Sequence, residues 1–144
     1  MKLAIGCDHA AFEEKNILID FIQTDLGYKV IDLGCYSSDS VDYPEYGHLV
    51  AKSVADKNVD KGIVICGSGI GISIAANKVK GIRAALCTSV EHAIMSRKHN
   101  DANVLAMGAR FTDIALSKSI IKAWLKTKFE GGRHLLRINK IENT

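Results

Sequence analysis

A cysteine at the entrance to a glycine-rich turn is the feature of this sequence best suited to chemistry. The apolar residues 63–65 lead directly into the segment Cys66-Gly67-Ser68-Gly69-Ile70-Gly71, and a helical pattern of small residues follows. An uncharged run of β-branched residues is typical of a buried parallel strand. The backbone N–H groups of a glycine-rich turn that enters a helix can bind phosphate or a developing oxyanion. The alternative for Cys66 is a buried structural thiol, because free cysteines favour protein cores.

Strands and amphipathic helices alternate along the chain and would position this turn. Helical patterns follow the expected strands, which are residues 2–7, 28–33, 63–66, 83–87 and 103–107. Ser89 and Thr112 are candidate N-caps of the last two of these helices. The glycines of segment 130–132 then form a hinge into a C-terminal helical tail. The pattern predicts one domain, residues 1–144, built as an α/β, three-layer, doubly wound (Rossmann-like) sandwich. Its five-stranded parallel sheet is expected to have the order 2-1-3-4-5.

This strand order brings two polar segments together. The first and third strands are neighbours in this order, and the ligand crevice of such a sheet opens at their carboxyl ends. Asp8 and His9 follow the first strand, and residues 66–71 follow the third. We therefore expect these two segments to form one site.

Composition excludes several classes of protein. The chain has 144 residues, of which 47% are hydrophobic, and its longest uncharged run, residues 62–77, is too short and too rich in glycine and serine to span a bilayer. Asp8 and His9 interrupt the apolar start before the core of a signal peptide could form. A cytoplasmic protein with free thiols is therefore expected, its cysteines being Cys7, Cys35, Cys66 and Cys87.

The net charge of +3 comes from one segment. Residues 126–144 hold five Lys and Arg side chains against two Glu side chains. A nucleic-acid surface normally needs a wider basic stripe or a known reading motif, and the sequence has neither. An anionic small molecule is the expected partner.

Nucleotide and metal motifs do not fit. The glycines at 67, 69 and 71 have the spacing G-x-G-x-G instead of the dinucleotide pattern G-x-G-x-x-G, and the first lysine after Gly71 is Lys78, too late for a P-loop. The five histidines contain no H-x-x-x-H pair, and the cysteines have no C-x-x-C spacing. A zinc site would have to be assembled from distant parts of the chain, so neither a metal nor a cofactor is expected.

Ordered motifs over nearly the whole chain resemble the type B ribose-5-phosphate isomerases, a family that also includes galactose-6-phosphate and allose-6-phosphate isomerases. The matching segments are 5–12, 42–44, 66–71, 97–103, 108–110 and 129–134, together with Arg137. The resemblance implies interconversion of D-ribose 5-phosphate and D-ribulose 5-phosphate in the non-oxidative branch of the pentose phosphate pathway. This reaction opens the sugar ring and moves a proton through a cis-enediolate without a cofactor.

The resemblance also implies roles for individual residues. Cys66 matches the catalytic base and His99 the acid that opens the ring, and the backbone amides of the turn would stabilise the enediolate oxygen. Phosphate and sugar would be bound by the remaining matched residues, namely Asp8, His9, Gly67, Ser68, Gly69, Ile70, Gly71, Asn100, Arg110, Arg133 and Arg137. Two further residues, Tyr43 and His134, match positions near the site, and their roles stay open. Ser68 stands where the family often has threonine. Serine keeps the hydroxyl of threonine and lacks its methyl group.

Three alternatives remain at the level of function and assembly. A hexose-6-phosphate isomerase would use the same residues, because one carbon of substrate length changes binding by only a few kcal/mol. A non-catalytic phosphosugar-binding module is the third function. The resemblance further implies a homodimer, or a tetramer of paired dimers, with sites shared between subunits, and the sequence does not assign each residue to one subunit.

Overall fold

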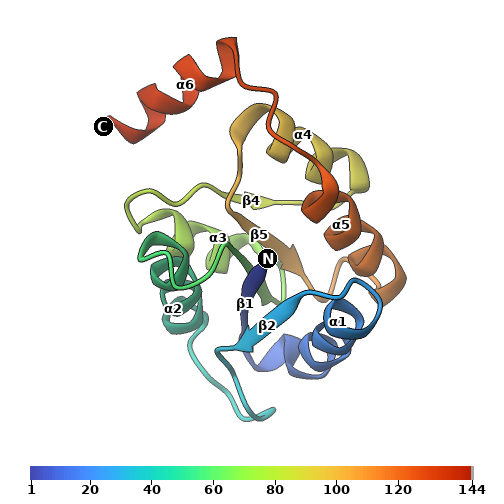
Figure 1. Ribbon diagram of the computed structural model, residues 1–144. Coiled ribbons are helices and arrows are strands. Elements are labelled where there is room, and N and C mark those ends of the chain that lie inside the picture. Colours follow the sequence, from blue (N-terminus) through green and yellow to red (C-terminus); the bar gives the residue numbers. More distant parts are fainter. Residues whose placement is uncertain (144) are drawn as a thin grey trace.

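The computed structural model describes residues 1–143 and has a parallel β-sheet between two layers of helices (Figure 1). Each predicted strand and helix is present, with ends that differ by a few residues from those expected. The elements along the chain are β1 (Lys2–Cys7), the 3₁₀ turn η1 (His9–Ala11), α1 (Phe12–Thr24), β2 (Lys29–Asp32), α2 (Tyr43–Ala55), β3 (Lys61–Cys66), α3 (Ile70–Asn77), β4 (Ala84–Leu86), α4 (Val90–Asn100), β5 (Val104–Gly108), α5 (Ile114–Lys126) and α6 (Arg133–Glu142). No helix among the described residues has the length and apolarity needed to cross a membrane.

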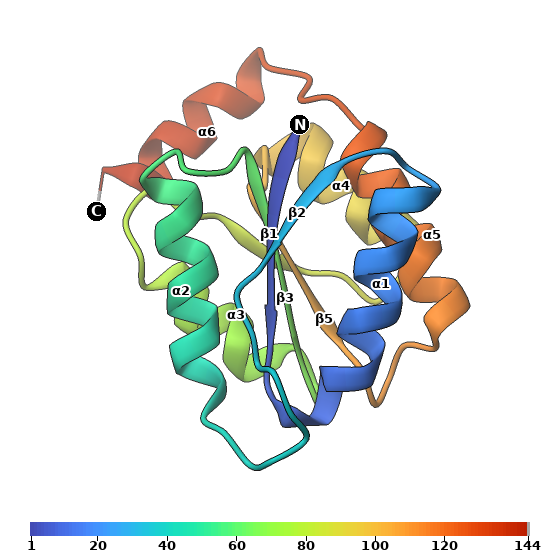
Figure 2. The same cartoon turned by 60° about the horizontal axis from the view of Figure 1, so that its bottom comes forward.

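Two apolar cores lie on opposite faces of the sheet. Alternate strand residues point to opposite faces, so Leu3 and Ile5 enter one core while Ala4 enters the other. The first core packs under α1, α4 and α5, and the second packs under α2 and α3. Figure 2 shows α2 and α3 on one side of the strands and α1 and α5 on the other. The three-layer architecture expected from the sequence is confirmed.

The order of the last two strands differs from the prediction. The sheet has the order β2-β1-β3-β5-β4, whereas 2-1-3-4-5 was expected. All five residues of β5 are buried, but the three residues of β4 are only partly buried. An interior parallel strand has both faces covered, and a short, half-covered strand fits the edge. The exchange places Gly108 directly opposite Cys66, so that the segment after β5 lies beside the glycine-rich turn.

The cap of α5 also differs from the prediction. Asp113, and not Thr112, is the N-cap residue, and its side chain accepts a hydrogen bond from the Leu116 N–H at 2.8 Å. The Thr112 hydroxyl is buried and has no hydrogen-bond partner among the described residues. Both residue types are good N-caps, so the choice between neighbours depends on packing, which buries Thr112 and leaves Asp113 exposed.

The two edges of the sheet carry different groups. The parallel strands all end at one edge, where β1 and β3 lead into η1 and the turn before α3. At the opposite edge, α4 ends just before β5 begins, and α6 packs against α4, with Glu142 of α6 paired to Arg83 just before β4. The end of the sheet at which the strands finish is called the carboxyl edge below, and the end at which they begin is called the amino edge. Neither name refers to the outer strands β2 and β4.

A buried ion pair fastens α1 to the carboxyl edge. The Lys15 ammonium, whose side chain is fully buried, donates to both carboxylate oxygens of Asp32 at 2.6 Å and to the Cys35 carbonyl at 2.8 Å. Removal of one partner of a buried ion pair is strongly destabilising because the other charge stays buried, and the cost is smaller where the remaining charge is partly exposed to water.

The variant Asp32→Ala is therefore expected to lower the free energy of unfolding by about 3 kcal/mol, because it leaves the Lys15 charge buried and unpaired. Lys15→Met removes the charge and leaves Asp32 one-third exposed, so it is expected to cost about 1 kcal/mol. Urea unfolding of the two variants beside the wild type measures both values. Equal losses would show that the unpaired charge is not the cause.

Candidate active site

Cys66 ends β3 and lies against the first residues of the glycine-rich turn. Its side chain is almost fully buried at 3% exposure, and the Gly69 N–H donates a hydrogen bond to its Sγ at 3.1 Å. The helix α3 begins one residue later, at Ile70, so the positive end of its dipole faces the same region. A donated hydrogen bond and a helix N-terminus both stabilise negative charge. The sulfur therefore lies beside a backbone donor and the start of a helix, at the mouth of the turn.

Burial holds two other thiols of the protein in their protonated form. Burial raises the pKa of Cys7 to about 12, and the neighbouring Cys35 adds to this increase. Burial likewise raises the pKa of Cys87 to about 11. Both thiols stay protonated at neutral pH and cannot serve as the base.

The turn is closely packed, which explains two of its glycines. Gly69 has a φ of +78°, and a Cβ atom on it would lie 2.7 Å from the Met107 carbonyl carbon. A Cβ on Gly71 would lie 2.6 Å from the Tyr43 ring, so the phenol of Tyr43 packs directly on the turn. The Ser68 hydroxyl accepts a hydrogen bond from the Ile70 N–H at 3.2 Å and helps to fix the entry into α3. Side chains at 69 and 71 would displace the walls of the site.

Asp8 and His9 lie beside the turn because β1 pairs with β3. The Asp8 N–H donates to the Ile65 carbonyl at 3.1 Å, and its carboxylate, which is mostly buried, caps η1 by accepting from the Ala10 N–H at 3.0 Å. The Nδ1 atom of His9 accepts the Val41 N–H at 3.2 Å. In a neutral imidazole this bond leaves the proton on Nε2, which becomes a donor.

Arg110 reaches the same place from β5. Its N–H donates to the Gly67 carbonyl at 3.0 Å, and its guanidinium lies 3.1 Å from the position of a Cβ on Gly67. The structure thus gathers at the carboxyl edge a thiol, a carboxylate, an imidazole, a phenol, a guanidinium and a glycine-rich turn, the residues being Asp8, His9, Tyr43, Cys66, Gly67, Ser68, Gly69, Ile70, Gly71 and Arg110. This set can hold an anionic polar molecule against a base.

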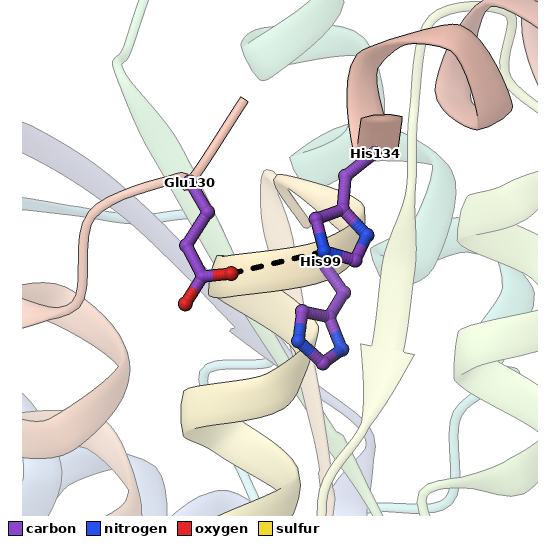
Figure 3. Close-up of side chains that lie close together, drawn as sticks. All are labelled: His99, Glu130 and His134. Atoms are coloured by element: carbon purple, nitrogen blue, oxygen red, sulfur yellow. Dashed lines mark ion pairs between the residues drawn. The ribbon is translucent and has the colours of Figure 1, made fainter. Parts of the chain in front are cut away.

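The other predicted site residues lie at the amino edge. The imidazole rings of His99 and His134 stack, with centroids 4.3 Å apart and an interplanar angle of 12° (Figure 3). Glu130 approaches the pair, its Oε2 lying 3.7 Å from His134 Nε2, and its backbone N–H donates to the Lys98 carbonyl at 3.1 Å. The remaining members of this group come from the end of α4 and from α6, and they are Asn100, Arg133 and Arg137.

Charge and burial act together on His134. Its side chain is largely covered, and this desolvation lowers its pKa; His99, Arg133 and Arg137 nearby lower it further. Glu130 opposes this change with its negative charge. His134 therefore favours the neutral imidazole at neutral pH.

A single chain keeps the two groups apart. His99 lies at the end of α4, close to where β5 begins, whereas Cys66 pairs with Gly108 at the end of β5. The four steps from Val104 to Gly108 along β5, between these edges, correspond to about 13 Å at ~3.3 Å per residue. A small sugar held at Cys66 therefore cannot reach His99 of the same chain.

A family model described as Ribose/Galactose Isomerase matches residues 3–141. The chain belongs to this family. Among its relatives, ribose-5-phosphate isomerase B of Escherichia coli is 49% identical over 97% of this chain and 93% of its own length. A D-erythrulose-4-phosphate isomerase of Pectobacterium atrosepticum is 42% identical over 98% of this chain and 93% of its own length.

Solved structures of the family agree with the fold. The ribose-5-phosphate isomerase B of Clostridium thermocellum superimposes with a TM-score of 0.97 at 52% identity, over 99% of this chain and 96% of that one. The Thermotoga maritima ribose 5-phosphate isomerase gives a TM-score of 0.96 at 45% identity, over 99% of this chain and 98% of that one. The resemblance read from the sequence motifs is confirmed.

The structure adds two contacts at the candidate site that sequence reasoning missed. Glu130 was interpreted as part of a hinge and of the matched segment 129–134, without a role for its side chain, yet this side chain joins the His99–His134 pair. The Val41 N–H fixes the orientation of His9 across 32 residues of chain. A backbone donor carries no signal in the sequence. The signals for Glu130 were its place in the matched segment 129–134 and its position four residues before His134.

Proposed function

We propose that this isomerase-family chain interconverts D-ribose 5-phosphate and D-ribulose 5-phosphate. The observation that carries the proposal is the Cys66 thiol, hydrogen-bonded by the Gly69 N–H at the mouth of a helix-entering turn, with Asp8 and Arg110 at the same edge. The names of the two ribose-5-phosphate isomerases that resemble the chain over almost its full length support the substrate. Four thiols without disulfide bonds support a reducing, cytoplasmic setting.

The proposed chemistry is a proton transfer between adjacent carbons. Cys66, as the thiolate, removes the C2 proton of the open-chain aldose and returns a proton to C1, while O2 loses its hydroxyl proton and O1 gains one, so that the carbonyl moves from C1 to C2 through a cis-enediolate. Negative charge develops on an oxygen during the transfer. The N–H groups of Gly69 and Ile70 already bond Cys66 Sγ and the Ser68 hydroxyl, so the N–H groups of Gly67, Ser68 and Gly71 are the ones proposed to stabilise that charge.

Ring opening is proposed to come from a second copy of the chain. His99, the matched acid, cannot reach Cys66 within one chain, whereas a twofold dimer can place the amino-edge group of one copy at the carboxyl edge of the other. The helix α6, which carries Arg133 and Arg137, projects from the body and packs mainly along α4 (Figure 1). It leaves Leu135, Leu136 and Ile141 about half or more exposed, an apolar surface that a second copy would cover. A homodimer with two shared sites follows, and pairing of dimers into a tetramer is a further step.

The substrate is tested directly with purified protein. Turnover of ribose 5-phosphate is compared with that of galactose 6-phosphate, allose 6-phosphate and D-erythrulose 4-phosphate, without added metal. The proposal expects the highest kcat/KM for the pentose. A preference for a hexose or the tetrose would keep the mechanism and change the substrate, and binding of sugar phosphates without turnover of any would favour a phosphosugar-binding module.

Arg137→Ala is expected to raise KM for ribose 5-phosphate about tenfold or more while kcat changes by only a few fold. The guanidinium binds a phosphate that takes no part in the proton transfer, so its removal weakens ground state and transition state alike. Steady-state kinetics measure the two parameters. Lys140→Ala, a change of another exposed cation on α6, is the matched control and should leave both unchanged. A fall in kcat with constant KM would contradict a binding role for Arg137.

His99→Asn is expected to slow isomerisation of ribose 5-phosphate about a hundredfold while sparing proton exchange into ribulose 5-phosphate. Ribulose 5-phosphate cannot close to a furanose because its O5 is phosphorylated, so it needs no ring-opening acid. Incorporation of deuterium from D2O at C1, followed by NMR, isolates the step assigned to Cys66. Loss of this exchange in His99→Asn would mean that His99 takes part in the proton transfer itself.

A further inference from the structure

Two imidazoles and a carboxylate meet at the amino edge, at the place where α4 is followed by β5 and α6 begins (Figure 3). One potential ligand atom from each of His99, Glu130 and His134 lies within 4.8 Å of the others. We propose that these three side chains form a binding site for a divalent cation of the Zn²⁺ type, and that a cation bound there inhibits the enzyme. The site itself stands on this geometry, and the inhibition rests on the proposed role of His99 in ring opening.

The donor set suits zinc. Two histidines and one glutamate, with the fourth position left to water, form one of the common three-ligand arrangements around Zn²⁺. Sequence spacing could not reveal the set because Glu130 and His134 follow α5 while His99 ends α4. The described residues contain no other group of three such side chains at comparable distances.

The side chains must move a little to close around an ion. Metal–ligand bonds of about 2.0–2.2 Å in a tetrahedron separate the donor atoms by about 3.3 Å. The Glu130 side chain is 46% exposed and can swing in from its present 3.7 Å contact with His134. A ring nitrogen binds a metal in the plane of its ring. The two rings are nearly parallel, so their nitrogens do not point at one ion, and one imidazole must also rotate. His134 is buried and His99 is only half-buried, which makes His99 the ring that turns.

Nearby cations set the strength of the site. Lys98 Nζ lies 3.3 Å from Glu130 Oε1, and Arg133 and Arg137 add positive charge near His134. Their repulsion opposes a dication, and Lys98 competes for the carboxylate. Binding of the dication is therefore expected to be reversible, as at a regulatory or inhibitory site, and removal of the Lys98 charge should raise the affinity.

Inhibition follows from the chemistry of a coordinated imidazole. A ring nitrogen that binds the metal has no proton to give, and the N–H on the other nitrogen of a metal-bound imidazole is a far weaker acid than an imidazolium, so His99 would lose its role in protonating the ring oxygen of the sugar. A dication beside Arg133 and Arg137 would also compete with these side chains for the substrate phosphate.

The test separates metal binding from catalysis. Zn²⁺ binding is measured by titration calorimetry, and Co²⁺ binding by its visible absorption, in a Cys66→Ala background that removes the thiol of the glycine-rich turn as a competing ligand. One ion per chain is expected, without thiolate charge-transfer bands. Glu130→Gln should weaken binding at least tenfold, Lys98→Gln should tighten it several-fold, and Glu13→Gln, a change of an exposed glutamate on α1, should have no effect.

Each outcome has a separate meaning. An absence of binding, or binding that Glu130→Gln does not weaken, would overturn the site and leave the proposed isomerase activity untouched. In the chain with Cys66 intact, Zn²⁺ should lower turnover of ribose 5-phosphate reversibly with EDTA, and Glu130→Gln should need at least tenfold more Zn²⁺ for half inhibition. Zn²⁺ bound at full occupancy without loss of turnover would overturn the inhibition and, with it, the role proposed for His99.

Discussion

Cys66→Ser is expected to reduce kcat for ribose 5-phosphate by about a thousandfold and to leave KM within a few fold of the wild type. A hydroxyl in place of the thiol is almost completely protonated at neutral pH, so the base is lost while the binding groups stay in place. The side chain ends a buried strand, and serine is close to it in size, so the Gly69 N–H keeps an acceptor. Steady-state kinetics with ribose 5-phosphate, together with the deuterium exchange at C1 of ribulose 5-phosphate, measure the loss.

A second cysteine supplies the matched control. Cys87 is as well buried as Cys66 and also lies at the end of a strand, but burial raises its pKa to about 11 and its Sγ faces Ser96. Cys87→Ser should therefore keep kcat within a few fold. If Cys66→Ser retained more than a tenth of the wild-type kcat, a group other than Cys66 would be the base.

Most of the fold followed from periodicity. Strand residues alternate or run apolar, helix residues repeat with a period near 3.6, and these patterns depend only on local sequence. Strand order depends on which strand has both faces covered. Residues 84–86 and 104–108 are both short apolar segments, so no pattern in the sequence shows that β5 lies inside and β4 at the edge.

The site, like the fold, has a part that local sequence predicts and a part that depends on packing. The turn at 66–71 is contiguous, and a parallel sheet must place Asp8 beside it because β1 and β3 are neighbours. The proximity of these two segments was predicted correctly. The stack of His99 on His134, with Glu130 beside it, depends on the path of the chain after α5. Such a path is determined by packing and, in the proposed dimer, by a second copy, and neither is written in residue spacing.

Mixing two inactive variants, Cys66→Ala and His99→Asn, is expected to restore about a quarter of the wild-type activity. If each site combines Cys66 of one copy with His99 of the other, a mixed dimer has one site with both lesions and one intact site. Random exchange of subunits makes about half of the dimers mixed, so about a quarter of all sites are intact. Isomerase assays before and after subunit exchange measure the recovery.

The size of the recovery decides between two arrangements. If His99 served Cys66 of its own chain, every site in the mixed dimer would carry one lesion and activity would not rise. Mixing Cys66→Ala with a double variant, Cys66→Ala and His99→Asn, is the control, because no arrangement of these chains has a cysteine in any site. Differently tagged chains, purified through both tags, show that exchange has occurred. A mixed dimer without activity would place both groups in one chain, which the strand length between Cys66 and the end of α4 does not allow without a large rearrangement of β5.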